Sequence, residues 1–230
     1  MKKLTAMAVA LLLGLSCVGC SPRSFCEIPT TYEEPPTFGT EDDGCPTAAP
    51  EKPVIYLYPE TRQQVAVKLD LHGQLTCTYP TYRDGWNVTA DPDGTLTDDR
   101  GQQYSYLYWE GITEDRFDYS SGYCIEGEYT AAFLEDALAQ LGLNRREANE
   151  FIVYWLPQME QNPYNLIYFQ QEAYTELAPL EITPTPDTLI RVFMTWQGSE
   201  AFVAVAPQDL TAPERQGFTA VEWGGTELAG

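Results

Sequence analysis

Two short apolar runs without polar alternation stand out along the chain, at residues 151–156 and 189–194. Both are rich in β-branched and aromatic side chains, which is typical of strands buried on both faces. Pro157 follows the first run directly, and because proline has no backbone N–H it would end a hydrogen-bond ladder there. We therefore predict that the two runs form neighbouring strands inside a sheet.

A second pattern, alternation of apolar and polar residues, covers residues 64–71. This period of two indicates a strand with one buried face. Turn sequences such as DPDG at 91–94 separate further short segments of strand character. We expect these additional strands at residues 52–59, 75–79, 86–90, 95–97, 103–110, 122–125, 165–169, 202–206 and 217–223.

The period becomes helical after residue 130. Apolar residues at 133, 134, 137, 138 and 141 share one helical face, with Thr130 placed to cap the helix and Gly142 to end it. Asn144 followed by Glu147 predicts the start of a second helix that ends near Glu150. The pattern predicts one α+β domain of mostly antiparallel β-sheet, sandwich or barrel-like, with an inserted helical hairpin.

Residues 1–19 have the pattern of a secretory signal peptide, in which Lys2 and Lys3 precede a short apolar run. The small residues and cysteines that follow resemble the lipobox of bacterial lipoproteins, whose cysteine carries lipid. Cys17 has the more usual preceding residues, but lipidation at Cys20 leaves an even number of cysteines behind it, so we predict Cys20. The alternative is an ordinary secreted protein cut by the general signal peptidase.

Residues 20–51 are rich in Pro, Thr, Glu and Asp and have almost no aliphatic side chains, so they cannot offset the entropy of ordering. We predict a lipid-anchored disordered stalk there, followed by a single domain at 52–227 and a tail at 228–230. Cys26 and Cys45 lie in the stalk, where they either form a disulfide or stay free. The protein would then sit on the extracytoplasmic face of the bacterial cell membrane.

The chain carries 13 basic and 34 acidic residues, a net charge of −21. Such a charge repels nucleic acid and anionic lipid, so we expect no nucleic-acid partner and contact with the membrane only through the N-terminal lipid. His72 is the single histidine, which excludes a multi-histidine metal site. We expect neither a metal nor a cofactor.

Cys77 and Cys124 each lie in a predicted strand, in a compartment that permits oxidation. We predict a disulfide between them, which would stabilise the fold by roughly 4 kcal/mol in the chain-entropy model. The alternative, a catalytic thiol, has only His72 as a partner base.

Three acids close to aromatic or apolar side chains, Glu110, Glu160 and Glu222, are candidate catalytic residues, because glycoside cleavage needs two carboxylates. A structural role competes with this interpretation. Arg191 lies in an apolar strand and must find an acceptor for its charge, so we predict an ion pair with Glu110 or Glu222.

Tyr104, Tyr106 and Tyr108 alternate along one predicted strand, so their side chains should share one face of the sheet. If that face is open, it is a candidate binding platform for a glycan or a peptide. If it is covered, the three rings belong to the core.

Six segments of the domain are distinctive in combination. They are KPVIYLYP at 52–59, PDGTL at 92–96, YLYWE at 106–110, YWLP at 154–157, RVFM at 191–194 and VEWGG at 221–225. Together they resemble an uncharacterised family of secreted or lipid-anchored bacterial proteins, with similar chains in fungi, over residues 52–227. The resemblance implies one intact domain and no known activity.

The anchor, the stalk and the aromatic-rich sheet favour a binding or structural module at the cell surface, without catalytic machinery. The alternative is a hydrolase that uses paired carboxylates on glycans.

Overall fold

The structure, a computed structural model, describes residues 47–114 and 116–228. Strands dominate it, and three α-helices and one 3-10 helix interrupt them. The elements are β1 (Thr47–Ala48), β2 (Glu51–Tyr58), β3 (Gln63–Leu69), β4 (Gly73–Tyr79), β5 (Trp86–Ala90), β6 (Leu96–Thr97), β7 (Gln103–Tyr104), β8 (Leu107–Glu114), β9 (Tyr123–Glu126), η1 (Gly127–Tyr129), α1 (Thr130–Gln140), α2 (Arg145–Met159), β10 (Tyr164–Phe169), α3 (Glu172–Leu177), β11 (Leu180–Thr183), β12 (Thr188–Ser199) and β13 (Thr219–Glu227).

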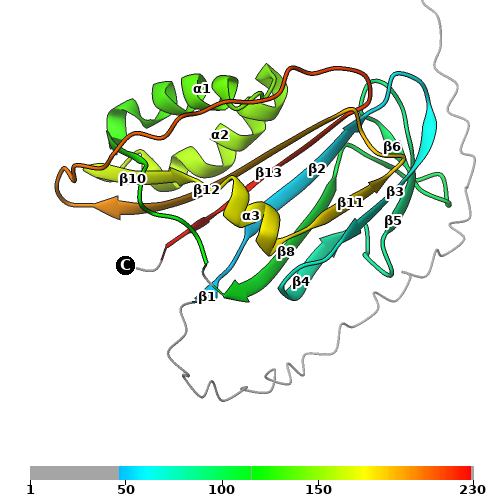
Figure 1. Cartoon of the computed structure of the whole chain (residues 1–230), viewed down its shortest axis with the longest axis horizontal. Helices are drawn as coiled ribbons and strands as arrows, with labels where there is room; N and C mark the ends of the chain where they lie inside the picture. Colours follow the sequence, from blue (N-terminus) through cyan, green and yellow to red (C-terminus); the bar gives the residue numbers. More distant parts are fainter. Residues whose placement is uncertain (1–46, 115, 229–230) are drawn as a thin grey trace, which may run out of the picture. The chain divides into compact units, whose positions relative to one another are not determined.

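The strands form two mostly antiparallel sheets, and the expected α+β class is confirmed. The larger sheet has the order β1-β8-β2-β13-β12-β10-β9, with β4 also paired to β8, and the smaller one has the order β11-β3-β5-β6-β7. The helices α1 and α2 lie across one face of the larger sheet (Figure 1), and the smaller sheet packs on its other face. The domain is therefore a three-layer stack with two hydrophobic cores.

Strand β2 shows how a central strand serves both cores. Val54 and Tyr56 point to the helical layer, while Ile55 and Leu57 point to the smaller sheet, and all four are almost fully buried. This follows from the period of two along a strand that is covered on both sides. Burying an aliphatic side chain of this kind contributes about 1.5–3 kcal/mol, so the central strands carry much of the stability.

The strand predicted at residues 151–156 is wrong, because this segment belongs to α2. Asn144 and Glu147 form the expected capping box, but the helix continues through Met159. Its buried residues are Ala148, Phe151, Trp155 and Met159, at helical spacing. Pro157 lies in the last turn, where its ring and missing N–H disturb only the carbonyl of Val153, on an exposed turn.

Other expectations were partly met. The run at 189–194 is central as expected, in β12, but its neighbours are β13 and β10. The strand expected at 103–110 is broken after Tyr104, and residues 202–206 form only an isolated bridge at Ala206. Strand pairing begins at Thr47, which lies inside the segment expected to be a stalk. The predicted signal peptide, Cys20, Cys26 and Cys45 lie outside the described residues.

Candidate functional site

The tertiary structure places Arg191 and Glu222 side by side on the parallel strands β12 and β13. Arg191 donates from Nε to Glu222 Oε2 at 2.7 Å and from Nη2 to the carbonyl of Ala178 at 2.8 Å. The side chains of Arg191 and Glu222 are 7% and 0% exposed. The ion pair expected for Arg191 is therefore made with Glu222, and Glu110 is not its partner.

The three candidate catalytic acids do not meet. Glu222 lies in the core between the sheets, where it also accepts from Trp109 Nε1 at 3.0 Å. Glu110 follows Trp109 in β8, so its side chain points to the opposite face of the same sheet. Glu160 caps the C-terminal end of α2. These acids therefore do not make the facing pair that glycoside cleavage needs.

The three alternating tyrosines do not share a face. Tyr104 lies in β7 of the smaller sheet and packs against the inter-sheet core. Tyr106 and Tyr108 pack instead against the core under the helices. The expectation of one platform is wrong because the chain changes sheets between Tyr104 and Leu107.

The predicted disulfide is also wrong. Cys77 in β4 and Cys124 in β9 are both free in the described structure, and they lie at opposite edges of the larger sheet. Five strands, β8, β2, β13, β12 and β10, separate them. At about 4.8 Å per strand, the cysteines are far beyond the separation a disulfide allows.

A different cluster forms where β2 and β8 pass beside α2. Tyr154 of α2 donates from its hydroxyl to Glu51 Oε2 at 3.3 Å. The negative charge of Glu110 also raises the pKa of this hydroxyl. Tyr108 and Glu110 of β8, Tyr106 just before β8, and Lys52 of β2 complete the cluster. We call it the tyrosine–carboxylate surface, and its six half-buried residues are Glu51, Lys52, Tyr106, Tyr108, Glu110 and Tyr154.

The acids change the acidity of these phenols. Burial and then the neighbouring Glu51 and Glu110 carboxylates raise the pKa of Tyr154 to about 12. Burial and then Glu110 raise the pKa of Tyr108 well above its ordinary value. Both hydroxyls therefore stay protonated at neutral pH and act as hydrogen-bond donors. Each carboxylate has lone pairs beyond those that one phenol uses, so it can accept further hydrogen bonds.

Lys52 supplies the positive charge of the surface. Its Nζ lies 5.7 Å from the centre of the Tyr106 ring, 5.4 Å from that of Tyr154 and 6.0 Å from that of Trp223, all within cation–π range. The backbone of Lys52 has φ 50°, a left-handed conformation that side chains other than glycine rarely adopt. The pairing of β2 with β13 shifts register at this point, and the irregularity aims the lysine at the rings.

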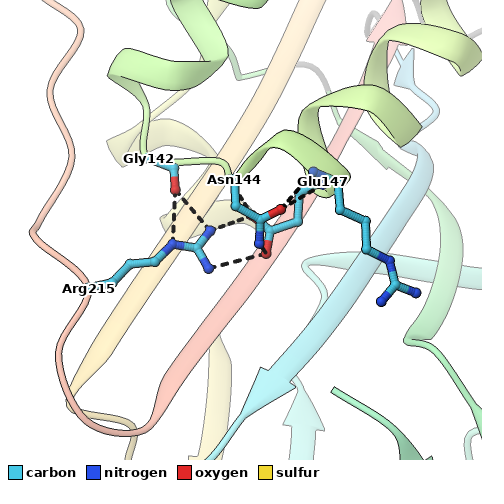
Figure 2. Close-up of polar contacts among 5 residues, drawn as sticks. Gly142, Asn144, Glu147 and Arg215 are labelled. Atoms are coloured by element: carbon cyan, nitrogen blue, oxygen red, sulfur yellow. Dashed lines mark hydrogen bonds and ion pairs between the residues drawn. The ribbon is translucent and has the colours of Figure 1, made fainter. Parts of the chain in front are cut away.

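A second polar network adjoins this surface at the start of α2 (Figure 2). Glu147 accepts from the backbone N–H and the side-chain amide of Asn144, both at 2.8 Å, and its 0% exposed side chain is ion-paired with Arg215. Arg215 also donates to the carbonyl of Gly142 from Nη2 at 2.9 Å. The network therefore fastens residues 200–218, which connect β12 to β13, to the beginning of α2. Burial and then the Glu147 carboxylate raise the pKa of Tyr58.

Sequence reasoning identified Tyr106, Tyr108 and Glu110 but missed Glu51, Lys52 and Tyr154. Tyr154 was hidden because its segment was interpreted as a strand. The alternation of Val54, Tyr56 and Tyr58 was a usable signal, since it already placed two further tyrosines on one face of β2. Tyr56 on this face donates to Glu150 Oε2 at 2.7 Å.

Two negative findings apply only to residues 47–114 and 116–228. No helix there combines the length and hydropathy needed to cross a bilayer. No three histidine, cysteine or acidic side chains gather there as a set of metal ligands.

Comparison with known proteins adds one relative. No family model matches the chain, and no solved structure matches it. Over 63 residues the chain is 49% identical to a protein of Butyrivibrio fibrisolvens that is described as "Uncharacterized protein in bglA 3'region". The match covers 26% of this chain and 65% of that protein, so the chain spans less than two thirds of the relative's length. The protein is therefore similar, over about a quarter of its length, to a protein of uncharacterised function.

Proposed function

We propose that this protein is a lipid-anchored extracytoplasmic module that binds neutral glycans at the tyrosine–carboxylate surface. The observation that carries the proposal is the combination of half-buried aromatic rings, carboxylate acceptors and one ammonium group around Tyr154. A sugar ring presents apolar C–H faces that stack on aromatic rings. Its hydroxyl groups both donate and accept hydrogen bonds, and the surface offers both kinds of partner.

The charge of the chain selects among glycans. With a net charge of −21, the protein repels acidic polysaccharides at long range. Within the surface, Glu51 and Glu110 favour ligands that donate hydrogen bonds, and a neutral sugar hydroxyl does so without adding negative charge. The proposal therefore predicts binding of neutral rather than anionic oligosaccharides.

An array of neutral and acidic oligosaccharides tests this prediction, followed by calorimetric titration of the best ligand. Tyr106→Ala and Glu110→Gln should each weaken binding at least about tenfold, because they remove a stacking ring and an acceptor. The matched controls are Tyr129→Ala and Glu128→Gln on η1, where Tyr129 is 58% exposed, and both should bind normally. Failure of every neutral oligosaccharide to bind, or equal losses in the controls, would contradict the proposal.

A second candidate function is hydrolysis of the bound glycan. It is favoured by one observation: Glu51 accepts a hydrogen bond from the Tyr154 hydroxyl, and the Glu110 carboxylate contributes to the raised pKa of the same hydroxyl. Chromatography of the oligosaccharide after long incubation separates the two functions. An intact glycan supports a binding module, while shortened products that disappear with Glu110→Gln support the hydrolase.

The lipid anchor at Cys20 is part of the proposal and rests on the signal-like leader and the lipobox-like residues. Cells fed a fatty-acid analogue should label the wild-type protein, because the cysteine that follows the cleavage site becomes acylated. Cys20→Ala should remove the label. If the label persists in Cys20→Ala and is lost in Cys17→Ala, the argument from the number of cysteines is wrong.

A further inference from the structure

Strand β12 has an open edge in the middle of the larger sheet. Its partner β10 ends at Phe169, opposite Met194, and the chain then turns into α3. The last main-chain contact on this side runs from Gln170 N–H to the carbonyl of Phe193, at 2.8 Å. Residues 188–192 are therefore paired with β13 on one side and have no strand on the other, among the residues the structure describes.

The backbone groups at this edge face outward in a regular pattern. Thr188 donates to the carbonyl of Phe218 just before β13, so its backbone groups point to the β13 side. Successive residues of a strand point their N–H and C=O groups to alternate sides. The backbone groups of Leu189 and Arg191 therefore point to the open side, the same side as those of Phe193. Neither has a main-chain partner there within the described residues. The backbone N–H and C=O groups of Leu189 and Arg191 thus form two donor–acceptor pairs, about 6.8 Å apart, along the open edge.

These groups line a hollow of about 460 Å³. One wall of the hollow lies on the helical side of the larger sheet and is apolar. It is formed by Leu141, Ile190, and Ala212 and Pro213 of the connection between β12 and β13. Ala212 and Ile190 pack closely around Gly142, because a Cβ atom added to this glycine would lie 2.8 Å from Ala212 and 3.1 Å from Ile190.

The other wall is α3, whose Tyr174 ring lies 4.5 Å from the Arg191 guanidinium. This wall presents the exposed acids Glu172 and Glu176, one helical turn apart. The hollow therefore has an apolar wall on one side and an acidic wall on the other.

Figure 2 shows the connection held in place by Arg215, which joins it to Gly142 and Glu147. Because Arg215 is bonded both to the fully buried Glu147 and to the carbonyl of Gly142, the apolar wall is held in place without a ligand. A preformed groove loses less entropy on binding than a flexible one.

We propose that this groove binds an extended peptide segment, in which basic and apolar residues alternate, as an added strand on the open edge of β12. Only an extended backbone offers donors and acceptors at the spacing that Leu189 and Arg191 present. An added strand points alternate side chains to opposite faces, so one set would contact the apolar wall and the other the acids of α3. This site is separate from the tyrosine–carboxylate surface, and its test is independent of glycan binding.

The probe is a fluorescent, acetylated octapeptide of alternating valine and lysine, titrated against the full chain in mild detergent and followed by anisotropy. The same peptide with glutamate in place of lysine should bind at least about tenfold more weakly, because it faces Glu172 and Glu176. Two further peptides carry N-methyl groups on either the valines or the lysines. Only one edge of the peptide faces β12, so one of them should lose binding and the other should keep it.

Protein variants locate the site. Leu189→Pro removes an outward N–H that β13 does not use and should weaken binding at least about tenfold, while Leu189→Ala keeps the N–H and should bind within about threefold of wild type. Glu172→Gln with Glu176→Gln should weaken binding, whereas the equal charge change Glu126→Gln with Glu128→Gln should not. Melting curves check that each variant folds. In the wild type, peptide should slow amide hydrogen exchange at Leu189 and Arg191, which keeps the proposal testable if Leu189→Pro does not fold.

Several results would overturn the proposal. They are an absence of binding at millimolar peptide, equal binding by both N-methylated peptides, and unchanged exchange at Leu189 and Arg191 when peptide is bound. Dimers of the peptide-free protein that Leu189→Pro dissociates would also overturn it, since they would make a second copy the occupant of the edge.

Discussion

Replacing Arg191 with methionine is expected to cost about 3–5 kcal/mol of unfolding free energy, among the largest effects of any single change in this chain. The substitution removes the positive charge that neutralises the fully buried carboxylate of Glu222, which then keeps neutral donors such as the indole N–H of Trp109. It also removes the bond to the Ala178 carbonyl and the guanidinium contact with the Tyr174 ring. The measurement is denaturant unfolding of the variant beside the wild type.

Glu222→Gln and the double variant complete a thermodynamic cycle. The two losses should not add, because once either partner is gone the other change removes an already unpaired group. Arg145→Met is the matched control, since it breaks the exposed pair with Glu135 and should cost less than about 1 kcal/mol. Additive losses, or an Arg191 variant as stable as the Arg145 variant, would show that the buried pair does not act as a unit.

Replacing Trp155 with alanine is expected to cost about 3–5 kcal/mol, while Val153→Ala should cost less than about 0.5 kcal/mol. Trp155 is 0% exposed and packs against Phe151 and Trp196 under the helices, whereas Val153 is 66% exposed. The difference depends on the helical conformation of α2, which turns the two side chains about 200° apart. Thermal and denaturant melting of both variants measures it.

The same pair of variants distinguishes a helix from a strand in solution. In a strand, residues two apart share a face, so Val153 and Trp155 would be buried or exposed together. Comparable losses in the two variants would therefore contradict the helical assignment. The conservative variant Val153→Ile serves as a control for the exposed position and should leave the melting temperature nearly unchanged.

The segment at 151–156 shows why local pattern was insufficient. A short apolar run with β-branched and aromatic residues fits a buried strand as well as a helix, and periodicity within the run cannot separate them. The decisive spacing extends from Ala148 to Met159, beyond the run itself. Pro157 misled the prediction because its cost depends on whether the freed carbonyl of Val153 reaches water, which the sequence does not state.

The candidate site was predictable only in pieces. Tyr108 and Glu110 lie in β8 and Tyr106 comes just before it, so the shared face of Tyr108 and Glu110 follows from the period of two, once the break after Tyr104 is known. Glu51 and Tyr154 join them from positions far away in the chain, through the packing of α2 on the larger sheet. No local rule brings a helix residue to a particular strand. The same limit explains the cysteines, because strand order decides which edges Cys77 and Cys124 occupy.

The sequence by itself determined the local features, which were the α+β class, most strands, the capping box of Asn144 and Glu147, and the need of Arg191 for an acidic partner. These follow from the alternation of side chains, from unsatisfied helix ends and from the cost of burying a charge, which are properties of neighbouring residues. Only the tertiary structure decided that Glu222 is the partner, that α2 continues past Phe151, and that β12 keeps an open edge. Each of these depends on contacts between distant segments, whose free energy no short stretch of sequence contains.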